Sequence, residues 1–307
     1  MKTKFIIVGM IVFCLSLINS CKKKEVEENL DPQVSQFNDD SNRYKSELDQ
    51  ADGDINEQIK GISGFGTAGS SSPLCGATID TIQLAQKIVI FNFDGISPCF
   101  SRTRAGQIKV ELTAGNSWAE VNAELTLTYI NFKVKRLSDG KSIAFNGVKT
   151  LKNINGNDWI GFLAGTAIFK YQERAYNMQV TFDNNLNATW NSARLIEWTY
   201  TPVVTRLNFT SNGDTIINGV AHVDSWGINR FSKSFTTYYT SPIHSNSECG
   251  LWRFNSGELV HYVDGKNFIL TLGVNEEGNP TTLACPYGYK VKWTAANGLT
   301  RTIILSY

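Results

Sequence analysis

The chain is poor in the residues on which most catalytic and metal sites depend. Its 307 residues include three methionines and three histidines, namely His222, His244 and His261. The histidines are isolated, so no H-E-x-x-H or other paired metal spacing is present. The sequence also lacks a G-x-S-x-G turn, a P-loop and any obvious pair of catalytic carboxylates. It therefore predicts no catalytic residue, no cofactor and no metal site.

An excess of charge of one sign is also absent. The 29 lysines and arginines and 28 acidic residues leave a formal charge of +1. Nucleic-acid-binding proteins usually carry a strongly basic surface, and this balance gives no such surface. Nucleic acid is thus excluded as an expected partner.

Long hydrophobic runs are confined to the N-terminus, where Lys2 and Lys4 precede an apolar segment from Phe5 to Ile18. This segment is too short to span roughly 30 Å of hydrocarbon but suits a signal peptide. Ile18-Asn19-Ser20-Cys21 resembles a lipobox. We therefore predict that residues 1–20 are removed and that Cys21 carries a lipid anchor. The alternative is an ordinary secretory signal followed by a free Cys21 thiol.

The cysteines independently indicate export. Cys14 lies in the predicted signal and Cys21 at the lipidation position, which leaves Cys75, Cys99, Cys249 and Cys285. Four cysteines in an oxidising compartment predict two disulfides, with three possible pairings. We favour Cys75 with Cys99 and Cys249 with Cys285, because each pair brackets strand-like runs that a hairpin brings together. A zinc site is the alternative, but close C-x₂-C spacing is missing.

The segment after Cys21 divides into three parts. Residues 21–32 form a charged tether, and residues 33–60 carry one apolar stripe with helical spacing. This stripe comprises Val34, Phe37, Tyr44, Leu48, Ile55 and Ile59. Residues 61–74 are rich in glycine and serine and predict a flexible linker. A G-x-G-x-x-G match within the linker lacks the strand and helix that dinucleotide binding needs.

From residue 75 onward the hydrophobic period changes to two. One such run is Tyr176, Met178, Val180 and Phe182, and Asn-Gly and Asp-Gly pairs separate the runs. This pattern predicts an all-β fold of antiparallel β-sandwiches, preceded by the amphipathic helix and linker. Similar turn sequences recur, so we expect two related lobes, at residues 75–190 and 191–307. Chance recurrence of hairpin sequences is the alternative.

Two loop features suggest ligands. Among the seven tryptophans, Trp118 and Trp226 lie beside glycines, at positions where exposed rings would bind a ligand. The segment from Asp183 to Asn187 has oxygen ligands at alternate positions, like a calcium loop, but lacks the turn glycine and the bidentate glutamate. We interpret that segment as a polar hairpin turn.

The order of these elements resembles a family. A lipobox, a charged tether and the helix containing SNRYKSELDQADGDI precede CGAT, FNFDGISPC, RAGQIKV, WGINRF and CGLWRFNSG. Together they resemble the uncharacterised lipoproteins of Bacteroidetes cell envelopes. The resemblance implies an envelope location and an architecture, but no catalytic residues. Lys22 follows Cys21 where inner-membrane retention is associated with aspartate, and this favours the outer membrane.

Three functions are compatible with these features. The first is a non-enzymatic binding or accessory module of the envelope, held by its lipid anchor, with a glycan or an envelope protein as its partner. The second is a polysaccharide hydrolase whose carboxylates converge only in three dimensions. The third is a structural spacer, which an absence of pockets and exposed aromatic patches would favour.

Overall fold

A computed structural model describes residues 32–66, 73–156, 162, 168–183, 185–248, 250, 253–295 and 298–307. The predicted signal, the lipidation position Cys21 and most of the tether lie outside these residues. So does Cys249. Predictions that concern these positions remain predictions.

The predicted helix is confirmed as α2, Pro32–Ile59. Its apolar stripe packs into the core, where Phe37, Tyr44, Leu48, Ile55 and Ile59 are at most 1% exposed. Gly53 lies within the helix without interrupting it. No helix among the described residues is long and apolar enough to cross a membrane.

The rest of the described chain is almost entirely antiparallel strand, which confirms the all-β class. The strands are β1 (Ala77–Asp80), β2 (Ile88–Asp94), β3 (Arg102–Ala114), β4 (Glu124–Arg136), β5 (Ser142–Asn153), β6 (Phe169–Phe182), β7 (Leu186–Thr201), β8 (Arg206–Gly213), β9 (Thr215–Ile217), β10 (Val220–Ile228), β11 (Ser234–Asn246), β12 (Phe254–Val263), β13 (Lys266–Val274), β14 (Gly288–Thr294) and β15 (Thr300–Ser306). Short 3₁₀ turns occur at Leu84–Gln86 and Pro202–Val204.

These strands form one continuous sheet. Its order is β1-β2-β3-β4-β5-β6-β7-β10-β11-β12-β13-β14-β15, with β8 pairing β7 and β11, and β9 pairing β10. The expected lobe boundary at residues 190 and 191 falls inside β7, which pairs β6 on one side and β8 and β10 on the other. The sheet is therefore not divided there, because one long strand belongs to both halves.

The first part of the predicted linker, residues 61–66, is ordered and packs on the rest of the protein. Residues 61–66 form turns, and Phe65 is fully buried. The Phe65 carbonyl accepts hydrogen bonds from the Trp118 amide at 2.7 Å and the Ser117 hydroxyl at 3.0 Å. Residues 67–72 lie outside the described residues. The start of this segment thus fixes the end of α2 to the β3–β4 connection.

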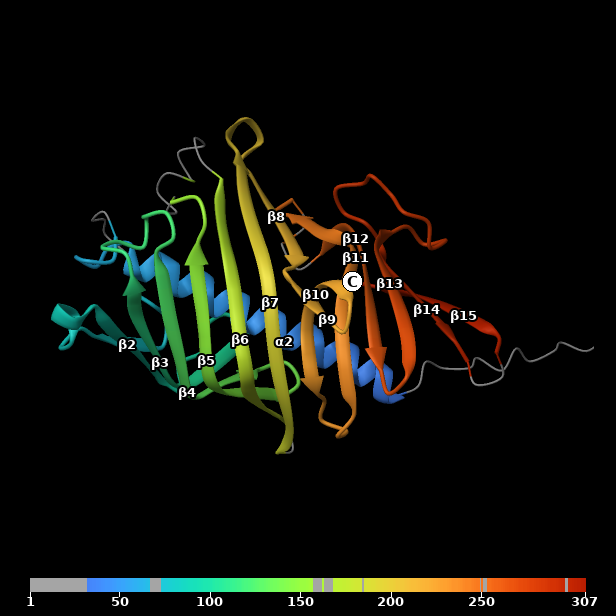
Figure 1. The fold of residues 1–307 in the computed structure, drawn as a ribbon, viewed down its shortest axis with the longest axis horizontal. Helices are drawn as coiled ribbons and strands as arrows, with labels where there is room; N and C mark the ends of the chain where they lie inside the picture. Colours follow the sequence, from blue (N-terminus) through green and yellow to red (C-terminus); the bar gives the residue numbers. More distant parts are fainter. Residues whose placement is uncertain are drawn as a thin grey trace, which may run out of the picture. The chain divides into compact units, whose positions relative to one another are not determined.

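Residues 36–59 of α2 cross the strands on one face of the sheet, which we call the inner face (Figure 1). Polar contacts follow the helix from β14 to β3. They are Asn38 with Tyr289, Lys45 with Asp224, Asp49 with Arg194, Asp52 with Lys149 and Asp54 with Arg104. The helix therefore covers the inner face of most of the sheet.

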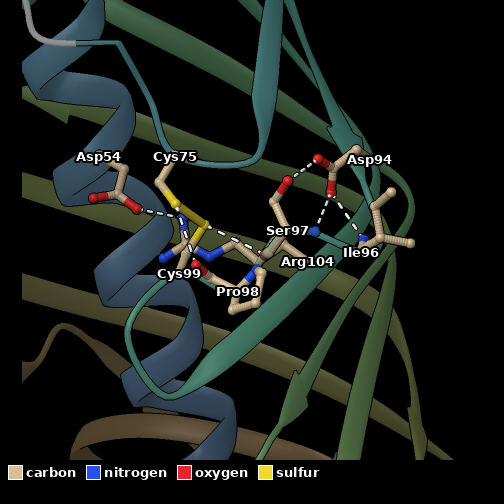
Figure 2. Close-up of a disulfide and its surroundings, with 8 residues drawn as sticks. All are labelled: Asp54, Cys75, Asp94, Ile96, Ser97, Pro98, Cys99 and Arg104. Atoms are coloured by element: carbon tan, nitrogen blue, oxygen red, sulfur yellow. Dashed lines mark hydrogen bonds and ion pairs between the residues drawn. A yellow bond between two sulfur atoms is a disulfide. The ribbon is translucent and has the colours of Figure 1, made fainter.

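The disulfide between Cys75 and Cys99 is confirmed, with its Cα atoms 5.8 Å apart. It joins the segment before β1 to the β2–β3 connection, beside the ion pair of Asp54 and Arg104 (Figure 2). Cys285 is also disulfide-bonded. Its predicted partner, Cys249, lies outside the described residues, so that pairing remains a prediction.

A series of backbone irregularities crosses β3 to β10. Gly106, Asn131, Gly147, Asn177 and Gly227 all have positive φ, and the strand register shifts beside the first four. Asparagine side chains stabilise two of these bulges. The backbone N–H of Asn131 donates to Asn146 Oδ1 at 2.7 Å, and the backbone N–H of Asn177 donates to Asn191 Oδ1 at 2.8 Å. Bulges bend strands and increase their twist, and they change which face a side chain occupies.

Gly106 provides a test of this geometry. A Cβ atom at Gly106, where φ is +89°, would lie 2.2 Å from the Asn131 carbonyl oxygen. We expect Gly106→Ala to lower the free energy of unfolding by about 3 kcal/mol, from backbone strain and overpacking. The control is Gly53→Ala, because a Cβ at this helical position meets no atom within 4 Å. It should stabilise the protein by about 0.5–1 kcal/mol in urea denaturation. A Gly106→Ala protein as stable as wild type would show that the bulge is dispensable.

Candidate functional site

Buried charges separate α2 from the inner face of the sheet. Besides the ion pairs of Arg104 with Asp54 and Arg102 with Glu47, the described part of the chain contains three groups. The central cluster comprises Asp49, Asp52, Lys149, Glu173 and Arg194. The N-terminal cluster comprises Asp40, Arg43, Asp183 and Arg230, and the third group pairs Lys45 with Asp224.

The central cluster lies in the protein interior. Lys149 Nζ is 2.5 Å from Asp52 Oδ1 and 3.9 Å from Glu173 Oε2. Arg194 Nη2 is 2.6 Å from Glu173 Oε2 and also contacts Asp49. The Lys149 and Glu173 side chains are 0% exposed. Because burying ions is costly, each charge here needs an opposite partner.

The balance of charge explains how the carboxyls titrate. Burial opposes ionisation of Glu173, but the adjacent Arg194 and Lys149 outweigh it and lower its pKa to about 2. Burial dominates at Asp52 and raises its pKa to about 7, despite Lys149. Asp52 Oδ2 has no hydrogen-bond partner among the described residues. Two cations thus compensate two of the three carboxyls, and Asp52 is the carboxyl that burial keeps protonated up to about pH 7.

This convergence of carboxyls suits neither hydrolysis nor metal binding. Oxygen atoms of Asp49, Asp52 and Glu173 lie within 4.8 Å of one another. Their surroundings already contain the cations Lys149 and Arg194, which compete with a metal ion. Asp52 and Glu173 are at most 1% exposed, so a polymer substrate does not reach them. The geometry instead positions α2 on the sheet.

The N-terminal cluster contains two arginines beside one ring. The guanidinium carbons of Arg230 and Arg43 lie 4.3 and 5.8 Å from the centre of Phe182, and both arginines donate to Asp183. Burial raises the pKa of Asp40 to about 6, although Arg230 opposes the shift. Asp183 lies in the turn that follows β6, as expected for the segment interpreted as a polar hairpin, and its carboxylate accepts hydrogen bonds from Arg43 and Arg230.

His261 is a core residue in this arrangement. It is 2% exposed, its ring packs edge-on to Phe37 at 5.0 Å, and its Nδ1 lies 2.8 Å from Thr237 Oγ1. Burial lowers the pKa of His261 to about 3. The imidazole is therefore neutral at physiological pH and enclosed.

The prediction that Trp118 faces a ligand is wrong. Trp118 is 4% exposed, and its indole N–H donates to Asn56 Oδ1 at 2.7 Å. The loop before it folds back onto Phe65, so a position beside a glycine becomes part of the core. The polar partner on α2 satisfies the indole N–H and permits this burial.

Trp226, the second predicted ligand-facing ring, is partly exposed on the outer face of the sheet. Its neighbour is Tyr176, which is 58% exposed and lies 6.1 Å away between ring centres. Sequence periodicity placed Tyr176 on the same face as Met178. The bulge at Asn177 reverses this alternation, because the register shifts between Ala175 and Met178. Glycine and asparagine within the neighbouring strands were the available signal for such a bulge.

Strand register places these rings in a transverse row. Asn191 pairs with Trp226, Trp226 with Thr236, Thr236 with Tyr262, and Tyr262 with Asn267. Tyr262 is 44% exposed. We define the outer strip as Tyr176, Trp226, Thr236, Tyr262 and Asn267, with Asn191 beneath it. Exposed Ile130 and Val148 extend the same face toward β4 and β5.

One polar hollow of about 320 Å³ lies elsewhere on the surface. Among its lining residues, Arg206 pairs with Glu248 at 3.0 Å and the Asn255 amide donates to the Ala284 carbonyl. Arg206 Nε and Asn255 Oδ1 have no hydrogen-bond partner among the described residues. It contains no histidine or carboxylate among its described lining residues.

Comparison with known proteins adds no assignment: no protein-family model, curated protein or solved structure matches this chain. Function is consequently inferred from the residues themselves. The inner clusters are enclosed beneath α2, whereas the outer strip is accessible. The outer strip is therefore the candidate functional surface.

The central cluster predicts a specific dependence on pH. Folded Asp52 keeps its proton to about pH 7, whereas its ordinary pKa is 3.8. The folded state thus binds more protons between these values, and Asp52 lowers the free energy of unfolding as pH rises through that window. Relative to wild type, Asp52→Asn should gain about 2–3 kcal/mol between pH 5 and pH 7.

Urea denaturation at each pH measures this gain. Asp264→Asn, at a carboxylate that is 57% exposed, controls for the loss of one acidic side chain. Parallel stability profiles for wild type and Asp52→Asn would contradict the charge balance described for the cluster.

Proposed function

We propose that this protein is a non-enzymatic binding module of the cell envelope, anchored by lipid at Cys21, and that the outer strip is its binding surface. The observation that carries the proposal is a row of rings, in which Tyr176 and Tyr262 are exposed and Trp226 is partly exposed. Exposed aromatic rings give a binding surface a large contact area and lose little conformational entropy when a ligand binds.

Two further features support a binding role. The carboxyls that converge in the fold are buried and paired with Lys149 and Arg194, so they do not form an accessible catalytic pair. The outer strip lies on paired strands rather than on loops, and rigid elements hold a binding geometry well. A stable sheet presenting a preformed surface needs little rearrangement to bind.

The anchor is tested by Cys21→Ser. If Cys21 is lipidated, this variant should move from the membrane fraction to the soluble fraction, because it lacks the acyl chains that hold it. Cys14→Ser is the matched control and should remain membrane-bound, since Cys14 lies in the segment predicted to be removed. Mass spectrometry of the membrane-purified wild type should show a diacylated or triacylated N-terminus. An unmodified N-terminus would contradict the anchor.

The binding surface is tested with the lipid-free Cys21→Ser protein and fractionated envelope polysaccharides and proteins. The double variant Tyr176→Ala/Trp226→Ala should lose about tenfold or more in affinity for the fraction that wild type retains, because central aromatic rings dominate binding energy. Tyr287→Ala is the control, since Tyr287 is 43% exposed but lies outside the outer strip. Equal retention by all three proteins would contradict a binding role for the strip.

A further inference from the structure

Building on the proposed function, we infer that the outer strip binds an extended, neutral β-linked glycan that lies across the strands. The inference combines the spacing of the rings, the polar groups between them and the absence of charge within the strip. It names the ligand class of the proposed binding surface.

The spacing fits a linear polymer of disaccharide repeats. Trp226, Thr236 and Tyr262 are successive register partners on β10, β11 and β12. Neighbouring strands are about 4.8 Å apart, so the backbone positions of Trp226 and Tyr262, two strands from each other, are about 10 Å apart. Tyr176 on β6 is separated from Trp226 on β10 by β7. The rings of Tyr176 and Trp226 pack together, with their centres 6.1 Å apart, and form one platform. Tyr262 forms a second platform two strands from Trp226, at an interval close to the length of one disaccharide in an extended β-linked chain.

Polar residues occupy the strands between the rings. Thr236 lies between Trp226 and Tyr262, and Asn267 follows Tyr262. Sugars present C–H faces that pack on aromatic rings and hydroxyls that form hydrogen bonds at their edges. Along the strip, the rings of Trp226 and Tyr262 match the C–H faces of sugars, and the polar side chains of Thr236 and Asn267 match the hydroxyls. A purely apolar protein surface would leave these polar side chains without partners.

The rings are held in place before any ligand binds. Tyr176 packs against Trp226 with an interplanar angle of 64°. Beneath them, the Asn191 side chain accepts from the Asn177 amide at 2.8 Å and donates to the Trp226 carbonyl at 3.1 Å. Asn191 is 9% exposed, so it supports the strip rather than contacting the ligand. Such preorganisation lowers the entropic cost of binding.

Charge narrows the ligand class. The outer strip consists of tyrosine, tryptophan, threonine and asparagine side chains and contains no acidic or basic residue. A polyanionic glycan gains no ion pair from these residues. The strip therefore favours uncharged hexose or N-acetylhexosamine units over uronic acids.

The test titrates the lipid-free Cys21→Ser protein with cellohexaose and chitohexaose and follows tryptophan fluorescence and calorimetry. Maltohexaose and polygalacturonate are the contrasting probes, with α-linkage and negative charge. We expect at least one β-linked hexamer to bind about tenfold or more tightly than both contrasting probes and than its own dimer. Trp226→Ala and Tyr262→Ala should each weaken binding about tenfold, whereas Tyr287→Ala should not. Thermal unfolding establishes that each variant is folded, and Trp226→Phe should retain most of the binding.

The outcomes separate this inference from the proposed function. If no β-linked hexamer binds but the strip variants lose an envelope protein partner, the glycan assignment is overturned and the binding module stands. If the strip variants match wild type toward glycans and envelope fractions alike, both are overturned. Equal binding of α-linked and β-linked hexamers also overturns the inference, because spacing would then not select the ligand.

Discussion

The compensation of buried charge between α2 and the sheet is the interaction on which the rest of this structure depends. Moving Asp52, Glu173 and Lys149 out of water is costly, and their mutual contacts offset that cost only in one arrangement. A shift of the helix by one turn would leave several of these ions buried without partners. Apolar residues of the same stripe would tolerate such a shift more readily. The charges therefore specify the position of the helix more than they add to its stability.

Because α2 covers the inner face in this way, the accessible aromatic rings of the described strands lie on the outer face. Side chains alternate between faces along a strand, so Ser192 contacts the central cluster while the adjacent Asn191 supports the outer strip. The bulge at Asn177 adds Tyr176 to the same outer row. The alternation of side chains along the strands therefore explains both the buried charges on the inner face and the aromatic rings on the outer face.

Local patterns in the sequence were sufficient for the local elements. Helical spacing identified α2, period-two alternation identified the all-β class, and cysteine spacing identified the Cys75–Cys99 disulfide. The predictions that were wrong depended on contacts between residues that are distant in the sequence. Trp118 is buried because Asn56, which is 62 residues away, accepts its indole N–H. A continuous sheet, rather than two lobes, arises because β7 pairs partners from both halves of the chain.

The inner charges carried a signal that the hydrophobic pattern alone did not reveal. Glu173 alternates with buried Tyr171 and Ala175 on β6, and Arg194 alternates with Ser192 and Ile196 on β7. Charged residues at such inward positions require opposite charges from another element. The acidic residues of α2 at positions 49 and 52 meet that requirement. Complementary charge at inward strand positions and on one helix face is therefore evidence that the two elements pack together, and it constrains their register more tightly than apolar periodicity does.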